Sequence, residues 1–95
     1  MITKADAEAI VMAELKKMET PSMPFAINES ATLEKPFGWV FFYNTYRFLE
    51  TGEYVHQLAG NGPVIVNRNS GEITRGRSNQ ALDAFIKEYE RALES

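Results

Sequence analysis

The feature that most restricts the fold is an apolar run at residues 38–43, Gly-Trp-Val-Phe-Phe-Tyr. Aromatic and β-branched side chains follow one another there without the 3.6-residue spacing of an amphipathic helix, and this composition favours a β-strand that ends at polar Asn44. Alternation would place Trp39 and Phe41 on one face and Val40 on the other. Because bulky apolar side chains point both ways, we expect both faces of the sheet to be at least partly covered.

Three further segments favour strands. Residues 64–68, Val-Ile-Val-Asn-Arg, are rich in β-branched side chains, and residues 72–75 form a short partner run after them. The Asn-Ser-Gly sequence at 69–71 supplies turn residues that tolerate positive φ, so a β-hairpin is expected. A weaker alternating pattern predicts an extended segment over residues 25–33.

A helix is predicted at each end of the chain. Residues 4–18 follow Thr3, and Asp6 stands three residues later, as in a capping box. Ser78 or Asn79 is expected to cap a closing helix over residues 79–94. Apolar residues fall on one face of each helix at Ala7, Ile10, Val11, Leu15 and Met18, and at Leu82, Phe85, Ile86, Tyr89 and Leu93.

Strand runs bracketed by helices predict a single α+β domain over residues 1–95. We expect a small antiparallel sheet of three or four strands with the N- and C-terminal helices packed on it. In the simplest arrangement the two helices share one face of that sheet.

Composition removes several functional classes. The 95 residues include no cysteine and one histidine, which excludes disulfides, thiolate zinc sites, iron–sulfur clusters and cysteine nucleophiles. A net charge of −3 argues against a nucleic-acid partner, because such binding depends on Lys and Arg neutralising phosphates. Charged side chains interrupt residues 1–20, so we expect no signal peptide, no membrane association and a cytoplasmic location.

The charge is unevenly distributed. Residues 1–34 hold three basic and six acidic side chains, residues 35–77 hold five and three, and residues 78–95 hold two and four. The acidic helices could therefore steer the chain toward a basic protein. Three arginines, Arg68, Arg75 and Arg77, flank the predicted hairpin, where they could face an anion or simply protect an exposed sheet edge.

No arrangement of residues predicts catalysis. His56 lies in an aromatic segment without a nucleophile-elbow pattern around any serine, and Glu50 and Glu53 are expected to be solvated. Gly62 is followed by Pro63 and a strand, where a phosphate-binding loop would lead into a helix. We therefore expect no enzyme activity, no metal and no cofactor.

The connection over residues 45–63 is much longer than the usual 2–6 residues, and such connections are typically functional or contain a further element. One interpretation is that Tyr46 and Phe48 prolong the preceding strand while Leu49, Val55 and Leu58 pack beneath the loop. The other is a partner surface, because Tyr, Phe and Arg are frequent interface anchors. The residues predicted to bind a partner are Tyr46, Arg47, Phe48, Glu50, Glu53, Tyr54 and His56.

Several motifs together resemble the YrhB-like immunity protein family, also called immunity protein 35. They are residues 37–43 with the Gly-Trp pair, Leu-Glu-Thr-Gly at 49–52, Leu-Ala-Gly-Asn-Gly-Pro-Val-Ile-Val at 58–66, Gly71, and the closing helix with Phe-Ile-Lys-Glu-Tyr at 85–89. The resemblance covers residues 2–92. It implies a bacterial immunity protein of a polymorphic toxin system, which binds and neutralises a cognate toxin by non-covalent occlusion.

The motif residues also have structural interpretations. Turn formation, the start of a strand and core packing explain these residue types without any partner. These residues, to which we assign structural roles, are Gly38, Trp39, Gly60, Asn61, Pro63 and Gly71.

Two other functions fit the sequence. A chaperone-like protein would bind exposed segments of unfolded clients through aromatic side chains or a sheet edge. A small-ligand module would need a pocket with convergent polar groups. The sequence is compatible with a monomer or a homodimer.

Overall fold

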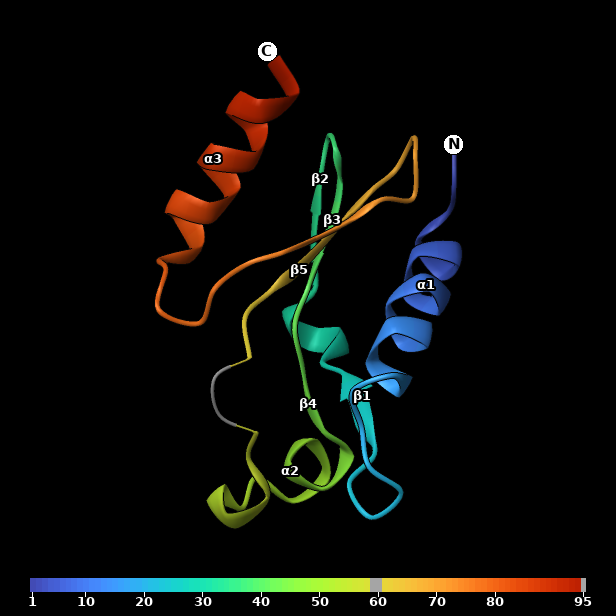
Figure 1. The fold of residues 1–95 in the computed structure, drawn as a ribbon, viewed down its shortest axis with the longest axis vertical. Helices are drawn as coiled ribbons and strands as arrows, with labels where there is room; N and C mark the ends of the chain where they lie inside the picture. Colours follow the sequence, from blue (N-terminus) through green and yellow to red (C-terminus); the bar gives the residue numbers. More distant parts are fainter. Residues whose placement is uncertain (59–60, 95) are drawn as a thin grey trace.

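The computed structural model describes residues 1–58 and 61–94, which extend over 42 × 27 × 22 Å with both ends of the chain at the same end of the molecule (Figure 1). Two small sheets lie between helices in this part of the chain. In chain order the elements are α1 (Lys4–Lys16), β1 (Phe25–Ile27), η1 (Glu29–Ala31), β2 (Leu33–Lys35), β3 (Gly38–Phe41), β4 (Tyr43–Thr45), α2 (Tyr46–Thr51), η2 (Tyr54–His56), β5 (Val64–Asn67), β6 (Ile73–Arg75) and α3 (Leu82–Glu94), where η marks a 3-10 helix.

The larger sheet has four antiparallel strands in the order β2-β3-β5-β6, and β1 pairs with β4 in a separate antiparallel ribbon. At the centre of the larger sheet, Trp39 lies opposite Val66, and Phe41 lies opposite Val64. Both central strands are almost wholly buried. The predicted α+β class and the small antiparallel sheet are confirmed.

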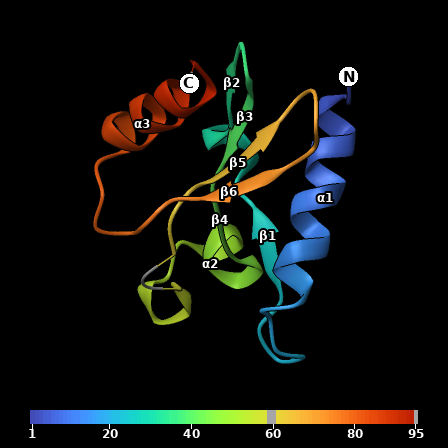
Figure 2. The ribbon, with the colours of Figure 1, turned by 45° about the horizontal axis from the view of Figure 1, so that its top comes forward.

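The two terminal helices cover opposite faces of the sheet, as Figure 2 shows with α1 and α3 on its two sides. The core on the α1 face joins Val11 and Leu15 to Trp39 and Phe41, while Phe85 and Ile86 of α3 join a second core around Val40 and Ile65. The expectation that both helices share one face is therefore wrong.

The physical reason is the apolar character of both faces of β3 and β5. A sheet whose strands are hydrophobic on both sides must be covered twice, and 95 residues supply two long helices for that purpose.

Helix α1 begins with the predicted capping box. The Asp6 N–H donates to the Thr3 hydroxyl at 3.1 Å, and the Thr3 N–H donates to the Asp6 carboxylate at 3.0 Å. These hydrogen bonds to Thr3 hold the pKa of the Asp6 carboxyl below its usual value, because they favour the charged form. The helix ends at Lys16, before Met18, which is exposed.

A carboxylate pair lies beside this helix. Glu29 of η1 raises the pKa of Glu8 through a shared hydrogen bond, with burial and charge repulsion adding to the shift. Lys4 lies 3.9 Å from the Glu29 carboxylate and partly offsets that repulsion.

Helix α3 starts three residues later than predicted, at Leu82, and the Phe85 N–H donates to the Ala81 carbonyl at 3.0 Å. The preceding residues form a turn, in which the Gln80 N–H donates to the Arg77 carbonyl at 3.3 Å. Neither Ser78 nor Asn79 is the cap. Leu93 at the far end is 50% exposed, because the end of α3 extends past the sheet (Figure 1).

The strand predicted over residues 25–33 is interrupted. β1 ends at Ile27, the 3-10 turn η1 follows, and β2 starts at Leu33 in the other sheet. The strand predicted over 38–43 is divided likewise between β3 and β4. The hairpin of β5 and β6 forms as predicted, with Gly71 in its turn at φ 74°.

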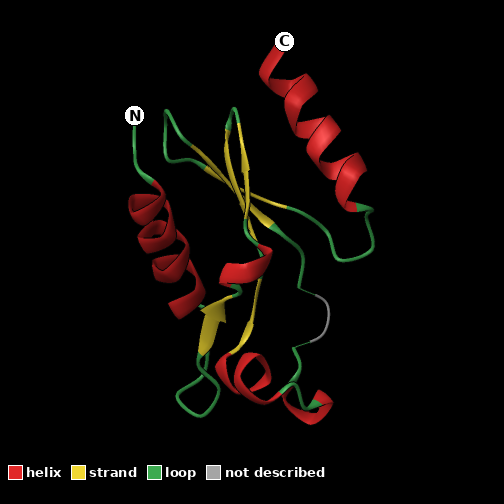
Figure 3. Ribbon diagram, turned by 180° about the vertical axis from the view of Figure 1, so that it is seen from behind, coloured by secondary structure: helices red, strands yellow, loops and turns green. Residues whose placement is uncertain are grey.

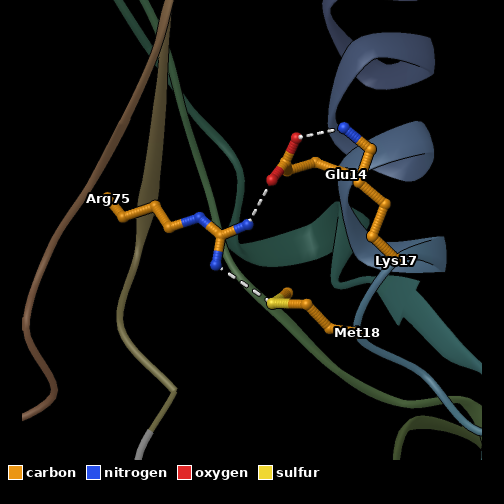
Figure 4. Close-up of polar contacts among 4 residues, drawn as sticks. All are labelled: Glu14, Lys17, Met18 and Arg75. Carbon is orange, nitrogen blue, oxygen red and sulfur yellow. Dashed lines mark hydrogen bonds and ion pairs between the residues drawn. The ribbon is translucent and has the colours of Figure 1, made fainter.

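Two of the three hairpin arginines hold the fold together. Arg75 of β6 reaches across to α1, where it pairs with Glu14 at 2.6 Å (Figure 4). It also donates to the sulfur of Met18, just beyond the end of that helix, at 3.0 Å. Lys17 lies 3.5 Å from the other Glu14 oxygen.

Arg68 stacks on the Trp39 ring, with its guanidinium carbon 4.8 Å from the ring centroid. It also donates to the carbonyls of Lys35 and Pro36, at 2.8 and 3.1 Å, and pairs with Glu34 at 3.2 Å. The end of β5 is thereby tied to the hairpin of β2 and β3.

Candidate functional site

The described part of the long connection contains two short helices. Strand β4 ends at Thr45, and Tyr46 opens α2, so the expectation that Tyr46 and Phe48 prolong the strand is wrong. Gly52 ends α2 in the left-handed conformation at φ 75°. The 3-10 helix η2 follows, and both lie at the end of the molecule opposite the chain termini (Figure 3). We call residues 46–56 the α2–η2 segment.

Side chains of β4 fasten this segment to the sheet. The Thr45 hydroxyl, on a residue only 1% exposed, accepts from the Phe48 N–H at 3.1 Å and donates to the His56 carbonyl. The Asn44 side-chain oxygen accepts from the Leu58 N–H at 2.7 Å. Both ends of the segment are therefore held by adjacent residues of one strand.

A third fastening follows after the segment, where the Asn61 amide donates to the Tyr43 carbonyl. The sequence did not indicate Asn44 or Thr45 as site residues. The sequence does contain one signal for them. Asn44 and Thr45 stand directly before Tyr46, the first residue of α2, and both residue types are favoured at helix N-caps.

The α2–η2 segment exposes large apolar side chains. Tyr46 is 53% exposed, Tyr54 is 82% exposed and Val55 is 78% exposed. Phe48 is half-buried, and its ring centroid lies 6.4 Å from that of Tyr54. The exposure of Val55 contradicts the interpretation that it packs beneath the loop, whereas Leu49 and Leu58 are half-buried.

The other residues predicted to bind a partner lie on the same segment. Arg47 and Glu50 are exposed on α2, Glu53 is exposed directly before η2, and His56 is half-buried at its end. The segment thus carries exposed charged side chains as well as exposed aromatic ones. Tyr46, Tyr54 and Val55, together with Arg47, Glu50, Glu53 and His56, form what we call the α2–η2 surface.

The motif glycines are explained mainly by close backbone approach. Gly38 has φ 148°, and a Cβ there would lie 2.0 Å from the Val66 carbonyl oxygen. Gly62 has no positive φ, yet a Cβ would lie 2.2 Å from the Gly76 carbonyl oxygen. Pro63 accepts from the Gly76 N–H at 2.8 Å, so residues 61–63 and 76–78 run closely side by side. Gly60 lies outside the described residues.

A cleft of about 330 Å³ opens beside the segment. Phe48 and Leu49 of α2 form one wall, and the closely paired backbones at Gly62 and Arg77 form another. The described residues that line it are Asn28, Phe42, Tyr43, Asn44, Phe48, Leu49, Asn61, Gly62, Pro63, Arg77, Ser78, Gln80 and Leu82.

Of the predicted partner-binding and motif residues that the structure describes, Phe48, Asn61 and Pro63 line this cleft and the others do not. Arg77, one of the three arginines considered as facing an anion, lines it too. Arg77, Ser78 and Gln80 line it next to the close backbone approach of Gly62 to Gly76, a tertiary contact with no local sequence signal.

Residues 1–58 and 61–94 contain neither a metal-binding cluster nor a membrane-spanning helix. In that part of the chain no three His, Cys, Asp or Glu side chains are grouped so as to hold a metal ion. None of its helices has the length and apolar character needed to span a membrane.

The fold and site define a small α+β protein that presents an anchored, aromatic-rich surface on two short helices beside a cleft of mixed polar and apolar lining. The chain belongs to the immunity protein 35 family, whose sequence pattern it matches over residues 5–91. It is 40% identical over 53 residues to the uncharacterized protein YrhB of Escherichia coli (strain K12), which is 56% of each chain. The chain thus spans about half the length of that curated relative. No solved structure was found to match it.

Proposed function

We propose that the protein is an immunity protein that binds a cognate bacterial toxin in the cytoplasm and neutralises it by covering a functional part of its surface. Membership in the immunity protein 35 family supports the class of function. The observation that carries the mode of action is the α2–η2 surface, where Tyr46, Tyr54 and Val55 are exposed on a segment anchored by Thr45.

Anchoring matters because binding costs free energy when loops must be ordered at the interface. Hydrogen bonds from Asn44 and Thr45 hold both ends of the segment before any partner arrives. Exposed tyrosines on such a preorganised segment offer large contact areas with little loss of conformational entropy. The surface therefore fits a protein that acts by binding, without catalysis.

The charge distribution supports a partner that is basic overall. Both long helices carry more acidic than basic side chains, and the whole chain has a net charge of −3. Long-range attraction of this kind mainly raises the association rate, so the rate constant is expected to fall as salt concentration rises.

The test is co-expression with the toxin encoded by the neighbouring gene. The proposal predicts survival of cells that make both proteins and co-purification of a stable complex. A toxin that still kills, or that never co-purifies, would overturn it. Suppressed aggregation of several unrelated unfolded proteins, without selectivity for the toxin, would favour the chaperone-like function instead.

A further inference from the structure

The three arginines around the hairpin have different environments. Arg68 stacks on Trp39 and pairs with Glu34. Arg75 pairs with Glu14. Arg77 is exposed and forms no ion pair or side-chain hydrogen bond within the described residues, and it lines the cleft beside α2. Among the described residues it is therefore a cation without a charge partner, next to a concave site.

The rest of the cleft lining is suited to an anion. Asn28, Asn44, Asn61 and Ser78, which carry amide or hydroxyl groups, line it together with Arg77, and no described Asp or Glu does so. One N–H of the Asn61 amide is already engaged by the Tyr43 carbonyl. The Asn44 oxygen is already engaged by the Leu58 N–H, which leaves its amide NH₂ as a donor for another group. Among the described lining residues, one arginine and several neutral polar side chains without an Asp or Glu favour a carboxylate ligand.

Apolar lining gives the site a second requirement. Phe42 and Leu49 line the same cleft, and Phe48 connects it to the α2–η2 surface through its ring contact with Tyr54. Because apolar side chains share the lining of this cleft, a ligand that fits it has an aliphatic part as well as the anion. An acidic side chain carried on a polypeptide has both.

We propose that this cleft binds an Asp or Glu side chain of the partner protein, with Arg77 as its charge partner. This inference rests on the proposed function, and it adds a specificity contact at the margin of the α2–η2 surface. A partner that is basic overall can still present one such residue. Long-range attraction depends on the total charge of the two proteins, whereas the cleft binds a single acidic side chain.

Direct binding can be tested without the toxin. The peptide Ac-Gly-Glu-Gly-NH₂ is titrated into the ¹⁵N-labelled protein and compared with Ac-Gly-Gln-Gly-NH₂. We expect saturable shifts at the amides of Gly62, Ser78 and Gln80 for the Glu peptide, with the Gln peptide about tenfold weaker, as the loss of a charge-assisted hydrogen bond implies. Equal responses to the two peptides would overturn the assignment.

Two variants and a control localise the effect. Arg77→Gln should abolish the preference for the Glu peptide, and Asn28→Asp should weaken it by adding a negative charge to the lining. Arg91→Gln removes an exposed arginine of α3 that does not line the cleft, and it should change nothing. Unchanged thermal melting of each variant shows that the fold is retained. A preference that survives Arg77→Gln would contradict the proposal.

A second arm uses the toxin complex. Arg77→Gln should weaken toxin binding about tenfold, while Arg91→Gln leaves it within twofold. If the Arg77→Gln variant binds the toxin with full affinity, the proposal that the cleft binds an acidic side chain of the toxin is wrong, and the proposed function is unaffected. If the wild-type protein does not bind the toxin, the proposed function is wrong. The peptide titration still shows whether the cleft binds an acidic side chain.

Discussion

The Thr45 hydroxyl donates a hydrogen bond to the carbonyl of His56, eleven residues along the chain, and accepts another from the Phe48 N–H. One buried side chain thus caps the start of α2 and fixes the end of η2. The exposed aromatics lie between these two points. The shape of the α2–η2 surface therefore depends on a residue that no partner would contact.

Replacing Thr45 tests this dependence. Thr45→Val keeps the shape of the side chain but removes both of its hydrogen bonds. It should lower the free energy of unfolding by about 1–3 kcal/mol, because α2 loses its cap and the His56 carbonyl loses its donor. Thr45→Ser keeps the hydroxyl and should cost less. Hydrogen exchange should show lost protection at Phe48 in the Val variant alone, and equal protection in both variants would contradict the anchoring role.

We expect any side chain at position 62 to destabilise the fold, because the backbone of Gly76 leaves no room for a Cβ atom there. Gly62→Ala would place a Cβ 2.2 Å from the Gly76 carbonyl oxygen, so the wall of the cleft must move, at a cost of about 1–3 kcal/mol or more. Gly52→Ala is the matched control, because Gly52 has φ 75° and open space around it. Its cost is about 1 kcal/mol, from backbone strain alone. Chemical denaturation measures both, and equal losses would argue against a close backbone contact.

The Arg75–Glu14 pair should make a modest contribution to stability. Its side chains are 43% and 32% exposed, so solvent screening limits the coupling to about 0.5–1 kcal/mol in a double-mutant cycle with Arg75→Gln and Glu14→Gln. The coupling should shrink in high salt. Lys17→Gln is the control, since Lys17 is 73% exposed and its pairing with Glu14 should contribute almost nothing. A coupling of zero would mean that the bridge in Figure 4 does not link β6 to α1 energetically.

The capping box at α1 makes a pH-dependent contribution. Hydrogen bonds to Thr3 lower the pKa of Asp6 in the folded state below its unfolded value of about 3.9. The resulting stabilisation is complete above the unfolded pKa and is lost as pH falls through the folded pKa. Asp6→Asn should therefore be less stable than the wild-type protein near pH 7, and the difference should shrink below about pH 3.9.

Thermal melts at pH 7 and pH 3 compare the two proteins. Glu8→Gln is the comparison variant, because the pKa of Glu8 is shifted in the opposite direction to that of Asp6. Glu29 raises the pKa of Glu8, so the folded state disfavours the charged form of Glu8. This variant should not be less stable than the wild-type protein near pH 7. A stability gap for Asp6→Asn that does not depend on pH would contradict the charge-based explanation.

Local signals predicted much of the fold. The capping box at Thr3 depends on residues three apart, and the turn at Gly71 depends on a short run that tolerates positive φ, so both were readable from the sequence. The central strands were readable from their apolar composition, which also predicted that both faces are covered. Which helix covers which face is a tertiary property, and the expectation of a shared face failed for that reason.

The candidate site was predictable only in outline. Its location in residues 45–63 follows from the length of the connection, but α2 has six residues and depends on Thr45 and Gly52 at its ends. So short a helix leaves no reliable periodic signal. The cleft was not predictable, because Gly62 and Gly76 meet only in the folded chain. The different environments of Arg68, Arg75 and Arg77 likewise depend on partners far away in sequence.

The central claim is that the α2–η2 surface binds the toxin, and the most direct test is the affinity of the variant Tyr46→Ala/Tyr54→Ala. Truncation of two hot-spot tyrosines should weaken binding by at least about 100-fold, with the melting temperature nearly unchanged because both side chains are exposed. Leu93→Ala, at an exposed apolar residue of α3, is the control and should bind as tightly as the wild-type protein. Wild-type affinity of the double variant would contradict the account.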